Sequence, residues 1–280
     1  MLWPIALYRS FVNLHFACTE CGDCCRDFRL PLSIAEALRW LADGHPVEVL
    51  CEAIPWPLEP PADDAGAAYK RARSFAARSG ALPVRIAVTL VAPLGQACPH
   101  LQPDRRCGIY LRRPMACRIY PADANPLGSM DPALRRCPEA AWLPSGPPLL
   151  QGIRCVDAST HSAIAQRQQA AVADAFLHAA LCASLGLRTA ALANEGYAVH
   201  TPARPLMLEV LRELAHTPVA APIDAATGRP DAIAQNWLCL SQRDHSLALL
   251  RSADAHCAAP PQTPSNTVQG DVQYLSWFAS

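Results

Sequence analysis

Residues 16–25 read Phe-Ala-Cys-Thr-Glu-Cys-Gly-Asp-Cys-Cys, a C-x2-C-x2-C-C motif. Two residues between successive cysteines let the chain turn back, so that both sulfurs approach one metal; zinc knuckles and ferredoxin loops share this spacing. Gly22 lies between two of the cysteines and suits a tight turn. The motif therefore predicts a metal site whose first candidate ligands are Cys18, Cys21, Cys24 and Cys25.

A second group of cysteines follows, in the segments Cys98-Pro99-His100-Leu101, Cys107-Gly108-Ile109-Tyr110, Arg113-Pro114-Met115-Ala116-Cys117-Arg118-Ile119-Tyr120-Pro121 and Cys137-Pro138. In this order of motifs the chain resembles the CxxCxxCC family, the YkgJ-like cysteine-cluster proteins. The resemblance covers about residues 11–140 and implies a zinc- or iron-chelating domain. Its implied ligands are Cys18, Cys21, Cys24, Cys25, Cys98, Cys107, Cys117 and Cys137. Related motifs occur in flagellin lysine-N-methylases, which leaves a cluster-containing modification enzyme as an alternative.

The number and setting of the cysteines favour metal binding over disulfides. The chain has 13 cysteines, an odd number that one chain cannot pair completely. The first residues lack a basic region and a cleavage site for export, and charges or prolines interrupt every apolar run, so we expect a soluble cytoplasmic protein with reduced thiols. Five isolated cysteines are expected to behave as small buried hydrophobic residues: Cys51, Cys155, Cys182, Cys239 and Cys257.

Eight clustered thiols exceed the needs of one tetrahedral site. They permit two four-thiolate sites, or one site with spare thiols. A C-x2-C-x2-C run with a distant Cys-Pro is typical of bacterial ferredoxins, and both Cys98-Pro99 and Cys137-Pro138 supply that pair. The adjacent Cys24 and Cys25 cannot easily both bind one small ion. The sequence therefore favours an iron–sulfur cluster of the 4Fe-4S type, with a function in electron transfer or redox chemistry. Zinc is the alternative cofactor, and a structural zinc-binding interaction module is an alternative function.

The charges give little sign of nucleic-acid or membrane partners, because the formal net charge is zero. Residues 98–139 contain seven arginines and four acidic residues, and the excess of positive charge could offset the negative charge of thiolates. A redox or protein partner is left open. Tyr110, Tyr120 and Arg118 are expected to orient ligands, whereas His15, His100 and Asp23 are expected to lie beside the ligands or at the surface. The remaining sequence shows no phosphate loop, nucleophile elbow or dinucleotide fingerprint, so enzymatic activity is left open.

The expected fold is α+β. A loop-rich cysteine region with short strands and flanking helices (1–145) precedes a mainly helical extension (146–258) and a flexible tail (259–280). Ser33 and Glu36 predict a capped helix, and apolar alternation predicts a strand over 84–90. Further helices are expected over 67–79, 159–194, 204–216 and 232–255, and a proline-rich loop over 54–61.

Overall fold

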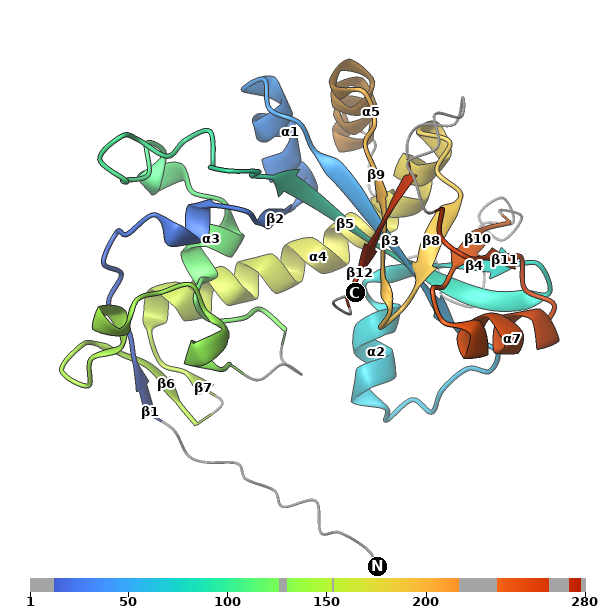
Figure 1. Cartoon of the computed structure of the whole chain (residues 1–280), viewed down its shortest axis with the longest axis horizontal. Helices are drawn as coiled ribbons and strands as arrows, with labels where there is room; N and C mark the ends of the chain where they lie inside the picture. The colour runs from blue at the N-terminus through green and yellow to red at the C-terminus, as the bar shows by residue number, and fades with distance from the viewer. Residues whose placement is uncertain (1–12, 126–129, 153, 217–235, 262–271, 278–280) are drawn as a thin grey trace, which may run out of the picture. The chain divides into compact units, whose positions relative to one another are not determined.

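The computed structural model describes residues 13–125, 130–152, 154–216, 236–261 and 272–277. Helices and strands mix along the chain, which confirms the α+β class (Figure 1). The chain divides into two compact units, each built from two separate stretches. We call them the cysteine unit (Met1–Phe28 and Leu94–Gln169) and the sheet unit (Arg29–Pro93 and Ala170–Ser280). No helix in the described ranges is both long and apolar enough to cross a membrane.

The sheet unit is organised around one mixed sheet, in the order β11-β10-β8-β3-β5-β2, with β4 paired to β5, β9 to β3 and β12 to β9. Strands β3, β8, β10 and β11 run parallel to one another, whereas β2, β4 and β5 form antiparallel pairs. The strands are β2 (Arg29–Leu32), β3 (Glu48–Pro55), β4 (Ser74–Ser79), β5 (Leu82–Pro93), β8 (Thr189–Leu192), β9 (Gly196–His200), β10 (Leu238–Leu240), β11 (Cys257–Ala258) and β12 (Val272–Ser276).

The two long strands β3 and β5, which run side by side in Figure 1, contribute to the core from both faces of the sheet. Their register places Val49 opposite Leu90 and Cys51 opposite Val88, and all four side chains are buried. Successive side chains of a strand point to opposite faces. Glu52, between Cys51 and Ala53, therefore belongs to the other face, where it is only half-buried.

Helices of the sheet unit supply the rest of its core. They are α1 (Ile34–Ala42), α2 (Ala65–Arg71), α5 (Arg204–His216), α7 (Asp244–Ser252) and the second half of α4 (Ala158–Ser184). Helix α1 begins as predicted, because the Ser33 hydroxyl accepts a hydrogen bond from the Glu36 backbone N–H while the Glu36 carboxylate accepts one from the Ser33 backbone N–H. Helices α1 and α5 pack together (Figure 1), and Leu41 of α1 and Leu211 of α5 are both fully buried.

Three predicted helices are wrong in part. Over 67–79, helix α2 ends at Arg71, and Ser74–Ser79 instead forms β4, which pairs with β5 across a turn at Gly80. Over 159–194, α4 ends at Ser184 and the chain continues as β8. Over 232–255, the described residues form β10 and then the short helix α7, and residues 232–235 lie outside the described ranges. In each case backbone pairing with a neighbouring strand outweighs the weak helical preference of an alanine-rich segment. The C-terminal half therefore adds strands to the helices expected there.

The cysteine unit is smaller and rich in loops. Strands β1 (Asn13–His15), β6 (Pro148–Gln151) and β7 (Arg154–Cys155) form a three-stranded sheet. Its short helices are η1 (Asp23–Cys25), η2 (Tyr110–Arg112), α3 (Met115–Ile119), η3 (Pro132–Leu134) and η4 (Glu139–Trp142). Ile119 and Ala122 pack on Ala163, in the first half of α4, and form the apolar support of the cysteine segments.

Candidate metal centre

All eight candidate ligands lie in the cysteine unit, and the first four sit on a tight turn. Cys24 and Cys25 belong to η1, whose start at Gly22 has a φ of 76°. The Cys25 N–H donates to the Gly22 carbonyl at 3.1 Å and closes the turn. A Cβ at Gly22 would also lie 3.2 Å from the Arg105 carbonyl oxygen, so this position needs glycine both for its backbone angle and for its space.

A direct backbone contact joins the first cysteine segment to the second. The Cys98 N–H donates to the Cys25 carbonyl at 2.6 Å. Backbone N–H groups of His100 and Leu101 are directed at the Cys98 sulfur and lower its pKa, although burial raises that pKa more. Leu101 and Cys107 pair as an isolated antiparallel bridge, which brings Cys107 back beside Cys98.

Cys117 and Cys137 approach from two further elements. Cys117 lies on α3, and its N–H donates to the Pro114 carbonyl. The Tyr120 hydroxyl accepts a hydrogen bond from the Arg136 N–H at 2.8 Å and also bonds the Cys137 thiol, lowering the thiol's pKa. Tyr120 thus links Arg136 to the candidate ligand Cys137. Tyr110 instead stacks with Arg113 at the surface.

The thiols influence one another in two overlapping sets. A hydrogen bond from Cys24 lowers the pKa of Cys25, while nearby Cys98, Cys117 and Cys107 raise it. Burial raises the pKa of Cys137 to about 11, and Cys24, Cys21 and Cys18 add to this increase. The first set therefore contains Cys25, Cys98, Cys107 and Cys117, and the second contains Cys18, Cys21, Cys24 and Cys137. Cys24 also interacts electrostatically with the first set, because it raises the pKa of Cys98 and Cys117.

Positive charge lies close to the thiols. Arg113 lowers the pKa of both Cys24 and Cys117, although burial and the neighbouring thiols keep the Cys117 pKa raised, to about 12. Two other arginines link the cysteine segments at the surface: Arg105 pairs with Asp23 at 3.2 Å, and Arg106 pairs with Glu20 at 3.0 Å. Asp23 is thus engaged in an ion pair, and His15 Nδ1 bonds the Gly146 carbonyl at 2.7 Å.

The donor set fits a thiophilic metal chemically. Eight thiols from four segments lie within electrostatic range of each other, and as thiolates they would repel, which is why burial and mutual repulsion raise several of their pKa values. A bound metal cation favours the thiolate form instead, because a thiol that coordinates a metal loses its proton. Across the described ranges, no three His, Cys, Asp or Glu side chains already stand in a ligand arrangement. Binding would therefore draw the sulfurs together, as is common where metal binding is coupled to folding.

The isolated cysteines lie elsewhere, and three of them behave as predicted. Cys51, Cys182 and Cys239 are fully buried in the sheet unit, whereas Cys155 and Cys257 are half-buried. All 13 cysteines are free thiols.

One residue that joins the cysteine segments could not have been identified from the sequence. The Arg136 guanidinium donates to the carbonyl oxygens of Arg26 and Asp27, so it links the segment before Cys137 to the one after Cys25. In the sequence Arg136 is one of several similar arginines, and no spacing signal distinguishes it.

Comparison with known proteins agrees with this geometry. No curated protein and no solved structure matches the chain. The model of one protein family matches residues 17–138, a span that holds every one of the eight clustered cysteines. That model is CxxCxxCC, described as a putative zinc- or iron-chelating domain, and the match covers less than half of the chain.

Proposed function

We propose that this protein holds iron–sulfur clusters through the thiolates of its cysteine unit and uses them in electron transfer. The observation that carries the proposal is that separate segments bring eight thiols together in one unit, through the Cys98 to Cys25 backbone hydrogen bond and the Leu101–Cys107 bridge. Four thiolates are the complement of one [4Fe–4S] cluster, and also of one structural zinc ion. Two sites, at Cys25, Cys98, Cys107 and Cys117 and at Cys18, Cys21, Cys24 and Cys137, would use every clustered cysteine.

Exposure of the ligands supports a redox role over a purely structural one. Cys18 and Cys24 are exposed, and the other six clustered cysteines are half-buried, so a cluster held here would lie near the surface of the unit, within reach of a redox partner. Arg113 would offset part of the negative charge of the thiolates. A reducing compartment such as the cytoplasm would keep these thiols available.

Anaerobic purification followed by metal and sulfide analysis tests the proposal. We expect brown protein with a broad visible absorption band and equal amounts of iron and acid-labile sulfide. Colourless protein with stoichiometric zinc and no sulfide would replace the iron–sulfur proposal by a zinc site. Protein without bound iron or zinc, after expression with both metals supplied, would refute metal binding altogether.

Two single variants test the division into two sets. Cys107→Ser removes a ligand of the first set and Cys137→Ser one of the second, so each should lower the bound iron by about half if each set holds one [4Fe–4S] cluster. Cys155→Ser is the matched control, because this half-buried thiol lies in the same unit but in neither set. Loss of all iron in both variants would show that the eight thiols serve one site.

A further inference from the structure

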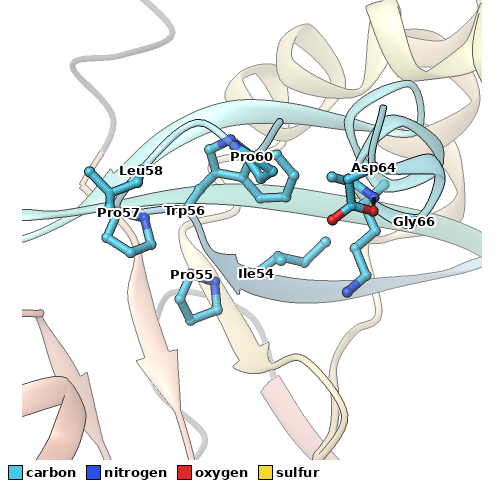
Figure 2. Close-up of a pocket in the computed structure, with 10 residues that line it drawn as sticks. Ile54, Pro55, Trp56, Pro57, Leu58, Pro60, Asp64 and Gly66 are labelled. Atoms are coloured by element: carbon cyan, nitrogen blue, oxygen red, sulfur yellow. Dashed lines mark hydrogen bonds between the residues drawn. The ribbon is translucent and has the colours of Figure 1, made fainter. Parts of the chain in front are cut away.

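The sheet unit contains a cavity that the cysteine site does not use. Its volume is about 340 Å³, and it lies where β3 ends and α2 begins. Figure 2 shows Pro57 and Leu58 at one end of it and Asp64 and Gly66 at the other. Trp56 forms part of the wall, and ligand pockets of roughly 300–1,000 Å³ are typically lined in this way by apolar and aromatic side chains.

The Trp56 ring is fixed by its surroundings. The indole N–H donates to the Glu59 carboxylate at 2.7 Å. The guanidinium groups of Arg71 and Arg85 lie 5.9 Å and 5.6 Å from the ring centroid, within the range of cation–π attraction. Arg71 pairs with Glu59, and Arg85 donates to Ser74. These interactions hold a flat apolar surface in place beside the cavity, and they also engage both arginines.

Lys70 is the polar group of the cavity wall that remains available. It is the one lysine of the chain, and it is exposed on the last turn of α2. Among the described residues its ammonium group takes part in no salt bridge or side-chain hydrogen bond, and its one recorded charge interaction is with Glu52. Asp64, the other ionisable residue of the wall, already accepts a hydrogen bond from the Ala67 N–H at 2.9 Å. The cavity thus offers one cation, and one carboxylate that is already hydrogen-bonded, beside lining residues that are mostly apolar.

Glu52 is the nearby carboxyl group whose charge acts on Lys70. It lies two residues before Ile54, a lining residue, on the same face of β3. Burial raises its pKa to about 7, while the Asn194 backbone N–H and Lys70 lower it. The other titratable groups that interact with it are Tyr197 on β9 and Cys51 on β3 itself, and its partners in register, Ala87 and Ala191, carry no charge. At mildly acidic pH Glu52 is neutral and leaves the charge of Lys70 uncompensated.

We propose that this cavity binds a small carboxylate with a flat apolar body, which lies against Trp56 and pairs its carboxylate with Lys70. With Glu52 protonated, the single positive charge of Lys70 matches one carboxylate, whereas a phosphate group carries more charge than Lys70 can match. The site does not depend on the metal centre, because all of its residues belong to the sheet unit.

The test uses the full chain and two probes of equal shape, 3-phenylpropionate and the neutral 3-phenylpropanamide, in calorimetric titrations supported by ligand-observed NMR. At pH 6 the carboxylate should bind saturably and the amide about tenfold more weakly, since the charged contact is lost. Lys70→Met should cause a similar loss, and Lys70→Arg should retain binding. Arg39→Met, which removes an exposed cation on α1, is the matched control for charge. Thermal unfolding of each variant checks that it folds.

A second arm uses pH. Carboxylate affinity should fall as the pH rises from 6 to 8 because Glu52 ionises and competes for Lys70, and Glu52→Gln should remove this dependence. Equal binding of the amide and the carboxylate would overturn the proposal, as would unchanged binding by Lys70→Met. Absence of saturable binding by either probe to folded protein would overturn it as well.

Discussion

Glu52→Gln should raise the free energy of unfolding at pH 8 and leave it nearly unchanged at pH 4.5. Glu52 lies within the sheet at a position flanked by alanines, and burial raises its pKa from 4.5 to about 7. The folded state therefore holds this proton more tightly than the unfolded state. The resulting stabilisation is complete below pH 4.5 and is lost as the pH rises to about 7, above which the folded protein contains a partly buried carboxylate.

The size of the effect follows from the same two pKa values. Their difference corresponds to at most about 3–4 kcal/mol. Since Glu52 is only half-buried, solvent screening reduces the expected gain to about 1–2 kcal/mol at pH 8. Glutamine keeps the shape and a hydrogen-bond acceptor for the Asn194 N–H but cannot ionise.

Urea denaturation at pH 4.5, 6 and 8 measures the change, with the midpoint as the readout and an unchanged slope as the check that the unfolding transition is comparable. Glu209→Gln, at an exposed position on α5, makes the same chemical change at the surface and should alter the midpoint little at any pH. If Glu52→Gln fails to stabilise the protein at pH 8, or stabilises it equally at pH 4.5, the argument from burial is wrong.

Three other perturbations address the core, the turn and the metal. Leu41→Ala removes a fully buried side chain and should lower the free energy of unfolding by about 2–5 kcal/mol, against less than about 1 kcal/mol for the exposed Leu249→Ala, as measured by thermal or urea unfolding. Gly22→Ala should reduce bound metal more than Gly44→Ala, because both glycines have positive φ but only at Gly22 would the new Cβ crowd the Arg105 carbonyl; metal analysis of the two purified variants decides this. Treatment with a strong chelator should increase amide hydrogen exchange over residues 94–125 and hardly change it in β3 and β5, since metal binding contributes directly to the stability of the segments that supply the ligands. If metal removal leaves amide exchange over residues 94–125 as unchanged as it leaves exchange in β3 and β5, the last expectation is wrong.

The sequence predicted best those elements whose signals are local. The capping box at Ser33 and Glu36 fixes the start of α1, and alternation of apolar residues identifies β5. The apolar face of residues 204–216 matches α5 over its full length. In these segments local preference and tertiary packing favour the same structure.

The errors occurred where distant partners decide the structure. Residues 74–79 form a strand because they pair with β5, with Phe75 opposite Ile86. The sequence of this segment alone contains no signal that predicts the pairing. β8 and β10 are central strands of only a few residues, too short to show a period. Their alanine-rich or mixed sequences resemble helices when viewed alone.

At the candidate metal centre the sequence identified the participating thiols but not their grouping. The spacing of Cys18 to Cys25 implies a turn, which Gly22 provides. The contact of Cys98 with Cys25 and the bond from Tyr120 to Cys137 depend on how separate segments fold together. The setting of Glu52 can be recognised in the sequence, because this carboxylate lies between apolar residues in the interior of β3.

The cysteine unit is made from stretches that lie on either side of β2–β5, and this order has a consequence during synthesis. Seventy-two residues separate Cys25 from Cys98, so at about 5–20 residues per second the ribosome needs roughly 4–15 s to deliver the next candidate ligand after Cys25. During that interval the four leading sulfhydryls emerge without their companions, while β2–β5 can already begin to pair. A metal site that uses both groups of cysteines can therefore be completed only after Cys98 and the later cysteines have been synthesised. Until then, the thiols of residues 18–25 are exposed to oxidants and to competing metal ions.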